Sequence, residues 1–128
     1  MNSTEINDCS RTVVDAAMMV HSALGPGLLE SAYEACMAHE LRSRGLRVAT
    51  QTTLPVVYRG ARIDAGYRID VLVEDAVVIE LKAVSRLLPI HQAQLLSYLR
   101  LSGCRLGLLI NFHVPRLRDG LKRMANNL

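Results

Sequence analysis

Three charged residues lie inside two otherwise apolar stretches, "YRIDVLVED" and "AVVIELKAV", which together cover residues 67–84. They are Asp70, Glu80 and Lys82. Paired carboxylates can bind a divalent cation, and an ammonium beside them can orient a water and offset negative charge on a phosphate. For one isolated charge in a strand, a structural salt bridge at the edge of the sheet is the simpler interpretation. For these three residues at this spacing we favour chemistry.

The parity of a β-strand decides whether the three side chains can meet. Side chains alternate across a strand, so Glu80 and Lys82 share one face. Asp70 lies opposite Glu80 if the two strands are joined by three residues, Glu74–Ala76, or by five, whereas a two-residue turn would place it opposite Ile79. Because the connection lacks an Asn-Gly or Asp-Gly pair, the longer loop is expected.

In this register the Cβ atoms of Asp70 and Glu80 would be about 5 Å apart, and like charges placed opposite each other destabilise a sheet. Either Lys82 or a divalent cation has to neutralise them, and oxygen ligands suit Mg²⁺ or Mn²⁺. Lysine is unusual in this chain, because thirteen of the fifteen basic residues are arginine. A lysine at position 82 therefore indicates a role for a compact ammonium.

The elements that would position these residues follow from periodicity and breakers. We expect an α/β sandwich around a mixed central sheet, with a strand at 76–84 that is apolar on both faces and therefore covered on both sides. The other expected elements are helices at 12–24, 28–44 and 89–103, a strand meander over 46–75, a buried strand at 104–112 and a short basic, weakly helical tail at 113–128.

Four polar residues on the expected helices could extend the site. Glu30 and Tyr33 are three residues apart and should face the same way, toward the sheet. Gln94 and Tyr98 share one stripe of the third helix. Taken singly, Glu30 is explained as a carboxylate that favours the helix dipole, Tyr33 as a core aromatic with a wet hydroxyl, and the polar stripe as a solvated face.

Composition limits the classes of protein. A chain of 128 residues with 50% hydrophobic residues predicts one folded domain, residues 1–128. Three widely spaced cysteines without a CxxC pair argue against a disulfide framework or a zinc site. Without a leader-like or membrane-spanning apolar run, we expect a soluble, cytoplasmic protein with no membrane partner. The net charge of +3 permits a polyanionic partner without requiring one.

Short motifs add a family resemblance. "GLLESAY", residues 27–33, matches the GxxExxY signature, and with "YRIDVLVEDAVVIELKAV", "HQAQLLSYL" and "GLLINF" the chain resembles the GxxExxY family of small bacterial proteins over residues 12–123. That family is similar to a branch of the PD-(D/E)XK nuclease superfamily. The resemblance implies a nuclease-like sandwich whose mixed central sheet is flanked by helices, although Ile69 replaces the proline that precedes Asp70 in the pattern.

The resemblance also implies roles for the residues. Asp70 and the Glu80-Leu81-Lys82 tripeptide match the metal-binding and water-activating residues, and Glu30 matches an additional acidic ligand. Gln94 and Tyr98 match the QxxxY element of RecB-like members. The expected function is a Mg²⁺- or Mn²⁺-dependent nuclease that acts on DNA in preference to RNA. A non-catalytic nucleic-acid or protein interaction module of the same fold is the alternative, and a homodimer is left open.

Overall fold

The structure is a computed structural model that describes residues 1–128. Its main body is a five-stranded sheet in the order β1-β4-β5-β6-β7, in which only β5 and β6 are parallel. The strands are β1 (Val48–Thr53), β4 (Arg68–Val73), β5 (Val77–Lys82), β6 (Leu106–Asn111) and β7 (Leu121–Ala125). The helices are α1 (Ser3–Leu24), α2 (Glu30–Ser43) and α3 (Pro89–Ser102).

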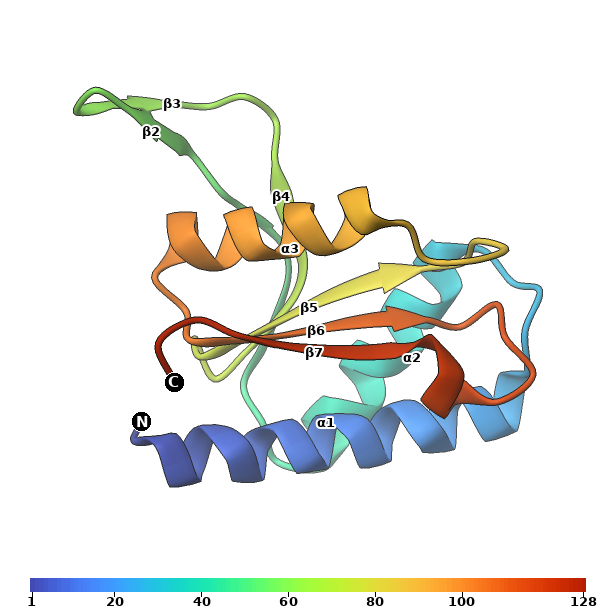
Figure 1. Cartoon of the computed structure of the whole chain (residues 1–128). Coiled ribbons are helices and arrows are strands. Elements are labelled where there is room, and N and C mark those ends of the chain that lie inside the picture. The colour runs from blue at the N-terminus through green and yellow to red at the C-terminus, as the bar shows by residue number, and fades with distance from the viewer.

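Helices cover both faces of this sheet (Figure 1). A larger core packs α1 and α2 against one face, and a smaller core packs α3 against the other. In β5 the side chain of Ile79 belongs to the larger core and that of Val78 to the smaller core, and five of the six residues of this strand are buried. The expected α/β sandwich, with a central strand covered on both sides, is confirmed.

Local signals explain where the helices begin and end. Asn2 and Glu5 form a capping box that begins α1 well before the expected residue 12. Pro89 is the first residue of α3, and Gly103 ends that helix in the left-handed conformation, as the sequence predicts. None of the three helices is both long and apolar enough to cross a membrane.

The region between β1 and β4 differs from the expected meander. The strands β1 and β4 pair directly with each other, and the intervening chain forms a separate hairpin of β2 (Val56–Tyr58) and β3 (Ala61–Ile63). This hairpin projects from the body above α3 (Figure 1). Pro55 and Gly66 flank the hairpin, so the chain leaves the main sheet at one break and returns at the other.

The expected weakly helical tail is wrong. After a short 3-10 turn, η1 (Leu117–Gly120), the chain forms β7, which pairs antiparallel with β6 at the edge of the sheet. Lys122 and Arg123 lie on this edge strand and are exposed to solvent. Their charges gave the segment the composition of a polar tail, so the strand was not recognised. All three cysteines, Cys9, Cys36 and Cys104, are free in the structure.

Candidate active site

Asp70 and Glu80 lie opposite each other on adjacent antiparallel strands. The ladder pairs Val71 with Ile79 and Val73 with Val77, so the next pair outward is Asp70 with Glu80. The connection contains three residues, 74–76, which is one of the two loop lengths that strand parity allows for this pairing. The predicted register is confirmed.

At this pair, side chains replace the backbone ladder. The amide of Asp70 donates to Oε1 of Glu80 at 3.2 Å, and the amide of Leu81 donates to Oδ2 of Asp70 at 2.9 Å. On its other side, Asp70 faces Gln51, whose φ of 51° interrupts the ladder between β1 and β4. The sheet therefore opens at Asp70, and both carboxylates occupy the opening.

Burial makes the carboxylate of Glu80 unusual. Glu80 is only 6% exposed. This burial is the larger cause, and the nearby charge of Asp70 the second, that together raise the pKa of Glu80 to about 9. The charge of Lys82 acts in the opposite direction but is the smallest of the influences on this pKa.

The structure holds no salt bridge at this site. The four ion pairs within 4.0 Å all lie elsewhere, and none involves Asp70, Glu80 or Lys82. Lys82 lies half-buried at the end of β5, where strand alternation places it on the face of Glu80. The interpretation of these three charges as a structural salt bridge is therefore wrong.

The helix α3 brings Gln94 and Tyr98 to this end of the sheet. Nε2 of Gln94 donates to the hydroxyl of Tyr98 at 2.9 Å, one helical turn away. Burial raises the pKa of Tyr98, and the charges of Glu80 and Asp70 raise it further, while the hydrogen bond from Gln94 lowers it. The phenol therefore lies within electrostatic reach of both carboxylates.

Glu30 approaches from the opposite side. It is the first residue of α2, is exposed, and lines a cavity of about 290 Å³ together with Asp70 and Leu81. Glu80 does not line this cavity, and nowhere in the chain do three Asp, Glu, His or Cys side chains come close enough together to hold a metal ion. Asp70 thus contacts Glu80 on one side and shares a cavity with Glu30 on the other, but the expected set of three ligands is not assembled.

Two residues that sequence reasoning missed line the same cavity. The amide of Gln51 donates to Oε1 of Glu34 and, at 3.3 Å, to Oδ1 of Asp70. Glu34 follows Glu30 by one helical turn, and this spacing could have identified it. No sequence signal marks Gln51, because its position depends on a left-handed backbone conformation in the middle of a strand.

Tyr33 supports the loop that leads to Glu30. The two residues do not face the same way: Tyr33 is fully buried and its ring stacks on Phe112, with 4.4 Å between ring centroids. Its hydroxyl is not simply wet, because it donates to the carbonyl of Gly25 at 2.6 Å and accepts from the amide of Leu28 at 3.2 Å. Tyr33 therefore fixes the start of α2 and, through it, the position of Glu30.

Replacement of Tyr33 by phenylalanine is expected to lower the free energy of unfolding by about 1 kcal/mol, because two hydrogen bonds to the loop are lost while the ring stays in place. Urea denaturation measures this change. Tyr58→Phe is the matched control, since Tyr58 is 61% exposed and its hydroxyl makes no hydrogen bond. Equal stabilities of the two variants would show that the loop does not depend on the Tyr33 hydroxyl.

Comparison with known proteins gives one match. A family model described as the PD-(D/E)XK nuclease superfamily matches residues 7–124. The chain has no significant match among curated proteins or solved structures.

Proposed function

Because this chain belongs to the PD-(D/E)XK nuclease superfamily, we propose that it is a metal-dependent nuclease that hydrolyses phosphodiester bonds in DNA in preference to RNA. One observation carries the proposal. Asp70 and Glu80 lie side by side where β4 and β5 separate, and no basic side chain forms an ion pair with either of them. Two adjacent carboxylates without a counter-charge are what a cation site requires.

The donor set fits Mg²⁺ or Mn²⁺. All the candidate ligands are carboxylate oxygens, and a divalent charge would favour the ionised form of Glu80, whose pKa is raised by burial and, after burial, by the charge of Asp70. Asp70 and Glu80 would hold the ion, with Glu30 reaching it across the cavity that it shares with Asp70. A bound ion supplies Lewis acidity toward the phosphodiester and a lower pKa for the attacking water.

The remaining residues act on the water and the phosphate. Lys82, on the face of Glu80, would orient the attacking water and offset the negative charge that develops on the phosphorus oxygens. The Gln94–Tyr98 pair would donate hydrogen bonds that orient the phosphate or the carboxylates. These groups lie on a sheet and a helix, which hold side chains more rigidly than loops do.

The proposal also covers the finer classification of the chain. We assign it to the GxxExxY branch, since the chain carries Gly27, Glu30 and Tyr33 of that signature, with Glu30 lining the cavity and the Tyr33 hydroxyl holding the loop before it. We treat residues 1–128 as one nuclease-like domain and the cytoplasm as its compartment, with the three free cysteines as support.

The direct test is cleavage of end-labelled single- and double-stranded DNA, and of matching RNA, with Mg²⁺, Mn²⁺ or EDTA. Cleavage of DNA is expected with either metal and should disappear in EDTA. The variant Lys82→Ala should lose at least about 10²-fold in rate, as when one charge-stabilising group is removed. Metal-independent cleavage, or full activity of Lys82→Ala, would contradict this mechanism.

A non-catalytic interaction module is the second candidate. One observation favours it: Glu30, Asp70 and Glu80 are not gathered into a set of three ligands. Under this alternative, purified protein binds nucleic acid or a protein partner but cleaves no substrate with any divalent metal.

A further inference from the structure

The projecting hairpin carries an apolar face that its own chain leaves uncovered. The register pairs Val56 with Ile63 and Tyr58 with Ala61, so these four side chains lie on one face. Tyr58 is 61% exposed and Ile63 is 45% exposed. Because an isolated two-stranded hairpin is at best marginally stable in water, a face of this kind is expected to contact a partner.

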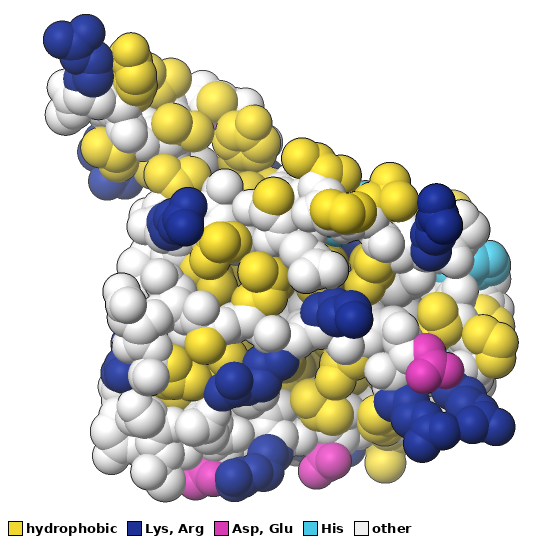
Figure 2. Space-filling model, in the orientation of Figure 1, with side chains coloured by type: hydrophobic (Ala, Val, Ile, Leu, Met, Phe, Trp, Pro, Cys, Tyr) yellow, Lys and Arg dark blue, Asp and Glu magenta, His cyan; other side chains and the backbone are white.

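This face leads into a groove between the hairpin and α3. The groove has a volume of about 530 Å³, and Val56 and Tyr67 on one side and Ile90 on the other contribute to its apolar lining. Figure 2 shows this apolar surface continuing from the hairpin onto the neighbouring body of the molecule. Gln94 and Tyr98 also line the groove, so its inner end is part of the candidate active site.

Two tyrosines form the inner wall of the groove. The rings of Tyr67 and Tyr98 meet edge to face, with 5.9 Å between centroids and 67° between planes. Tyr67 is 42% exposed, whereas Tyr98 is buried. The exposed ring is therefore available for stacking and lies beside the residue that is within electrostatic reach of the carboxylates.

The charges on the hairpin that borders the groove argue against a second copy of the chain and for a polyanion. The helix α3 contains no Asp or Glu, and the hairpin with its two connections, residues 54–68, contains three arginines and one acidic residue, Asp64. Arg59 lies in the hairpin turn, and Arg62, which pairs with Val57, lies on the face of the hairpin opposite to Val56 and Tyr58; neither arginine makes an ion pair with a carboxylate. Two copies that meet through this surface would bring arginines together, whereas a phosphate backbone complements them.

We propose that this groove binds single-stranded nucleic acid, with a base stacked on Tyr67 in the groove and the strand continuing over the hairpin, where Arg59 in the turn and Arg62 on the other face hold its phosphates. The inference rests on the proposed nuclease function and names its substrate class. In a duplex the bases are paired and stacked on one another, so they cannot enter an apolar groove, whereas an unpaired strand offers both a π-face and a charged backbone. The hairpin thus delivers an unpaired strand to the site at the end of the sheet.

Binding measured without cleavage tests this proposal. We would use fluorescence anisotropy with a labelled 20-nucleotide oligothymidine and a labelled 20-base-pair duplex, with Ca²⁺ in place of Mg²⁺. The single strand should bind at least about tenfold more tightly, and Tyr67→Ala should lose about tenfold in affinity while Tyr67→Phe retains it. In Arg59→Ala/Arg62→Ala, the slope of log affinity against log salt should fall by about 1.4 for two lost phosphate contacts.

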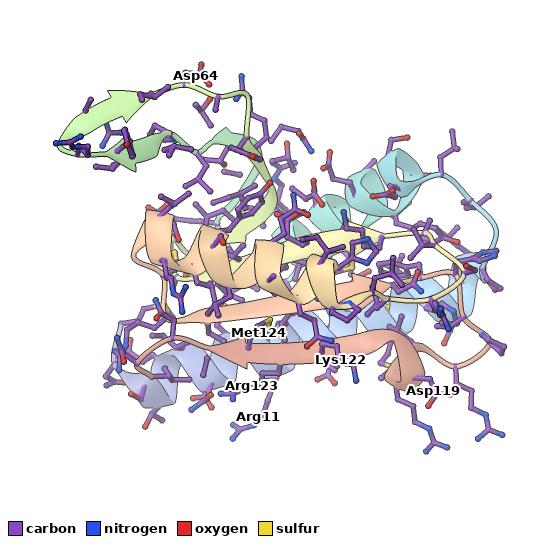
Figure 3. The ribbon with its side chains drawn as sticks, turned by 45° about the horizontal axis from the view of Figure 1, so that its top comes forward. Arg11, Asp64, Asp119, Lys122, Arg123 and Met124 are labelled. Carbon is purple, nitrogen blue, oxygen red and sulfur yellow. The ribbon has the colours of Figure 1, made fainter.

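Arg11→Ala/Arg123→Ala is the matched control, because it removes the same charge from α1 and β7. In Figure 3 the label of Asp64 marks the hairpin, and Arg11 and Arg123 lie on the opposite side of the molecule. The control should bind the oligonucleotide as the wild type does. Equal losses in both double variants, equal affinity for the duplex, or full affinity of Tyr67→Ala would each overturn the proposal.

Two further outcomes separate this inference from the proposed function. Tight single-strand binding that depends on Tyr67, without cleavage under any metal, supports the groove and contradicts the nuclease. Metal-dependent cleavage of duplex with no preference for single strands supports the nuclease and contradicts the groove.

A dimer in sedimentation that is lost in Tyr58→Ala/Ile63→Asp, while affinity for DNA is unchanged, would assign the apolar face to a second copy and overturn the proposal.

Discussion

Asp70→Asn is expected to lower the rate of Mg²⁺-dependent DNA cleavage by at least about 10²-fold, which is the scale for loss of one electrostatic catalytic group. The same variant should be at least as stable as the wild type in EDTA. Asparagine keeps an oxygen that can accept from the amide of Leu81, but it removes the charge that faces Glu80. A residue placed for a metal, and not for the fold, should lose activity without losing stability.

The measurements are single-turnover cleavage with Mg²⁺ and urea denaturation in EDTA. Asp15→Asn is the matched control, because Asp15 is an exposed aspartate on α1 that forms no ion pair. Its cleavage rate should equal that of the wild type. If Asp70→Asn destabilised the metal-free protein as strongly as a core substitution, the carboxylate would be structural and the nuclease assignment of this site would fail.

Glu80→Gln should change how metal-free stability depends on pH. The pKa of Glu80 is raised from 4.5 to about 9, so between these values the folded chain holds a proton that the unfolded chain has released. Stability contributed by this group is therefore fully present below pH 4.5 and decreases as pH rises toward 9, with a slope of at most about 1.4 kcal/mol per pH unit. Glutamine cannot ionise, so the variant should lack this decrease and exceed the wild type by several kcal/mol at pH 8.

Urea denaturation in EDTA at pH 5, 6.5 and 8 gives the difference between Glu80→Gln and the wild type. That difference should grow with pH, and Mg²⁺ at pH 8 should reduce it by stabilising the wild type alone. Glu30→Gln controls for the loss of one carboxylate from the neighbouring cavity. A constant difference across the three pH values would show that Glu80 is ionised in the folded protein throughout this range.

Much of the fold could be predicted from local signals. The apolar residues on both faces of β5 required helices on both sides, and Pro89 and Gly103 define the two ends of α3. The β7 strand could not be predicted in this way, because its strand conformation comes from pairing with β6 and not from its own pattern. The direct pairing of β1 with β4 was likewise hidden, since the sequence marks breaks at Pro55 and Gly66 but not which strands meet beyond them.

The candidate site likewise contains features that the sequence predicts and features that depend on tertiary packing. The opposition of Asp70 and Glu80 follows from strand parity and loop length, which are properties of the sequence. The burial of Glu80 and the missing ion pair to Lys82 depend on how three layers pack, and no spacing encodes them. The position of Glu30 depends on the loop that Tyr33 holds. The motif therefore predicted that Glu30 lies near Asp70, but it did not predict that Glu80 lies outside the cavity that Glu30 and Asp70 share.

The edge strand β7 also bears on the solubility of the protein. All six residues of β6 are buried, and five of them form the apolar or glycine run "LGLLI". If β7 detached, the backbone N–H and C=O groups along this run would be free to pair with another chain, and the run is apolar and has neither a charge nor a proline to prevent such pairing. The two charged side chains of β7, the adjacent and exposed Lys122 and Arg123, thus protect the molecule from aggregation by giving this edge of the sheet a positive charge that neighbouring copies repel.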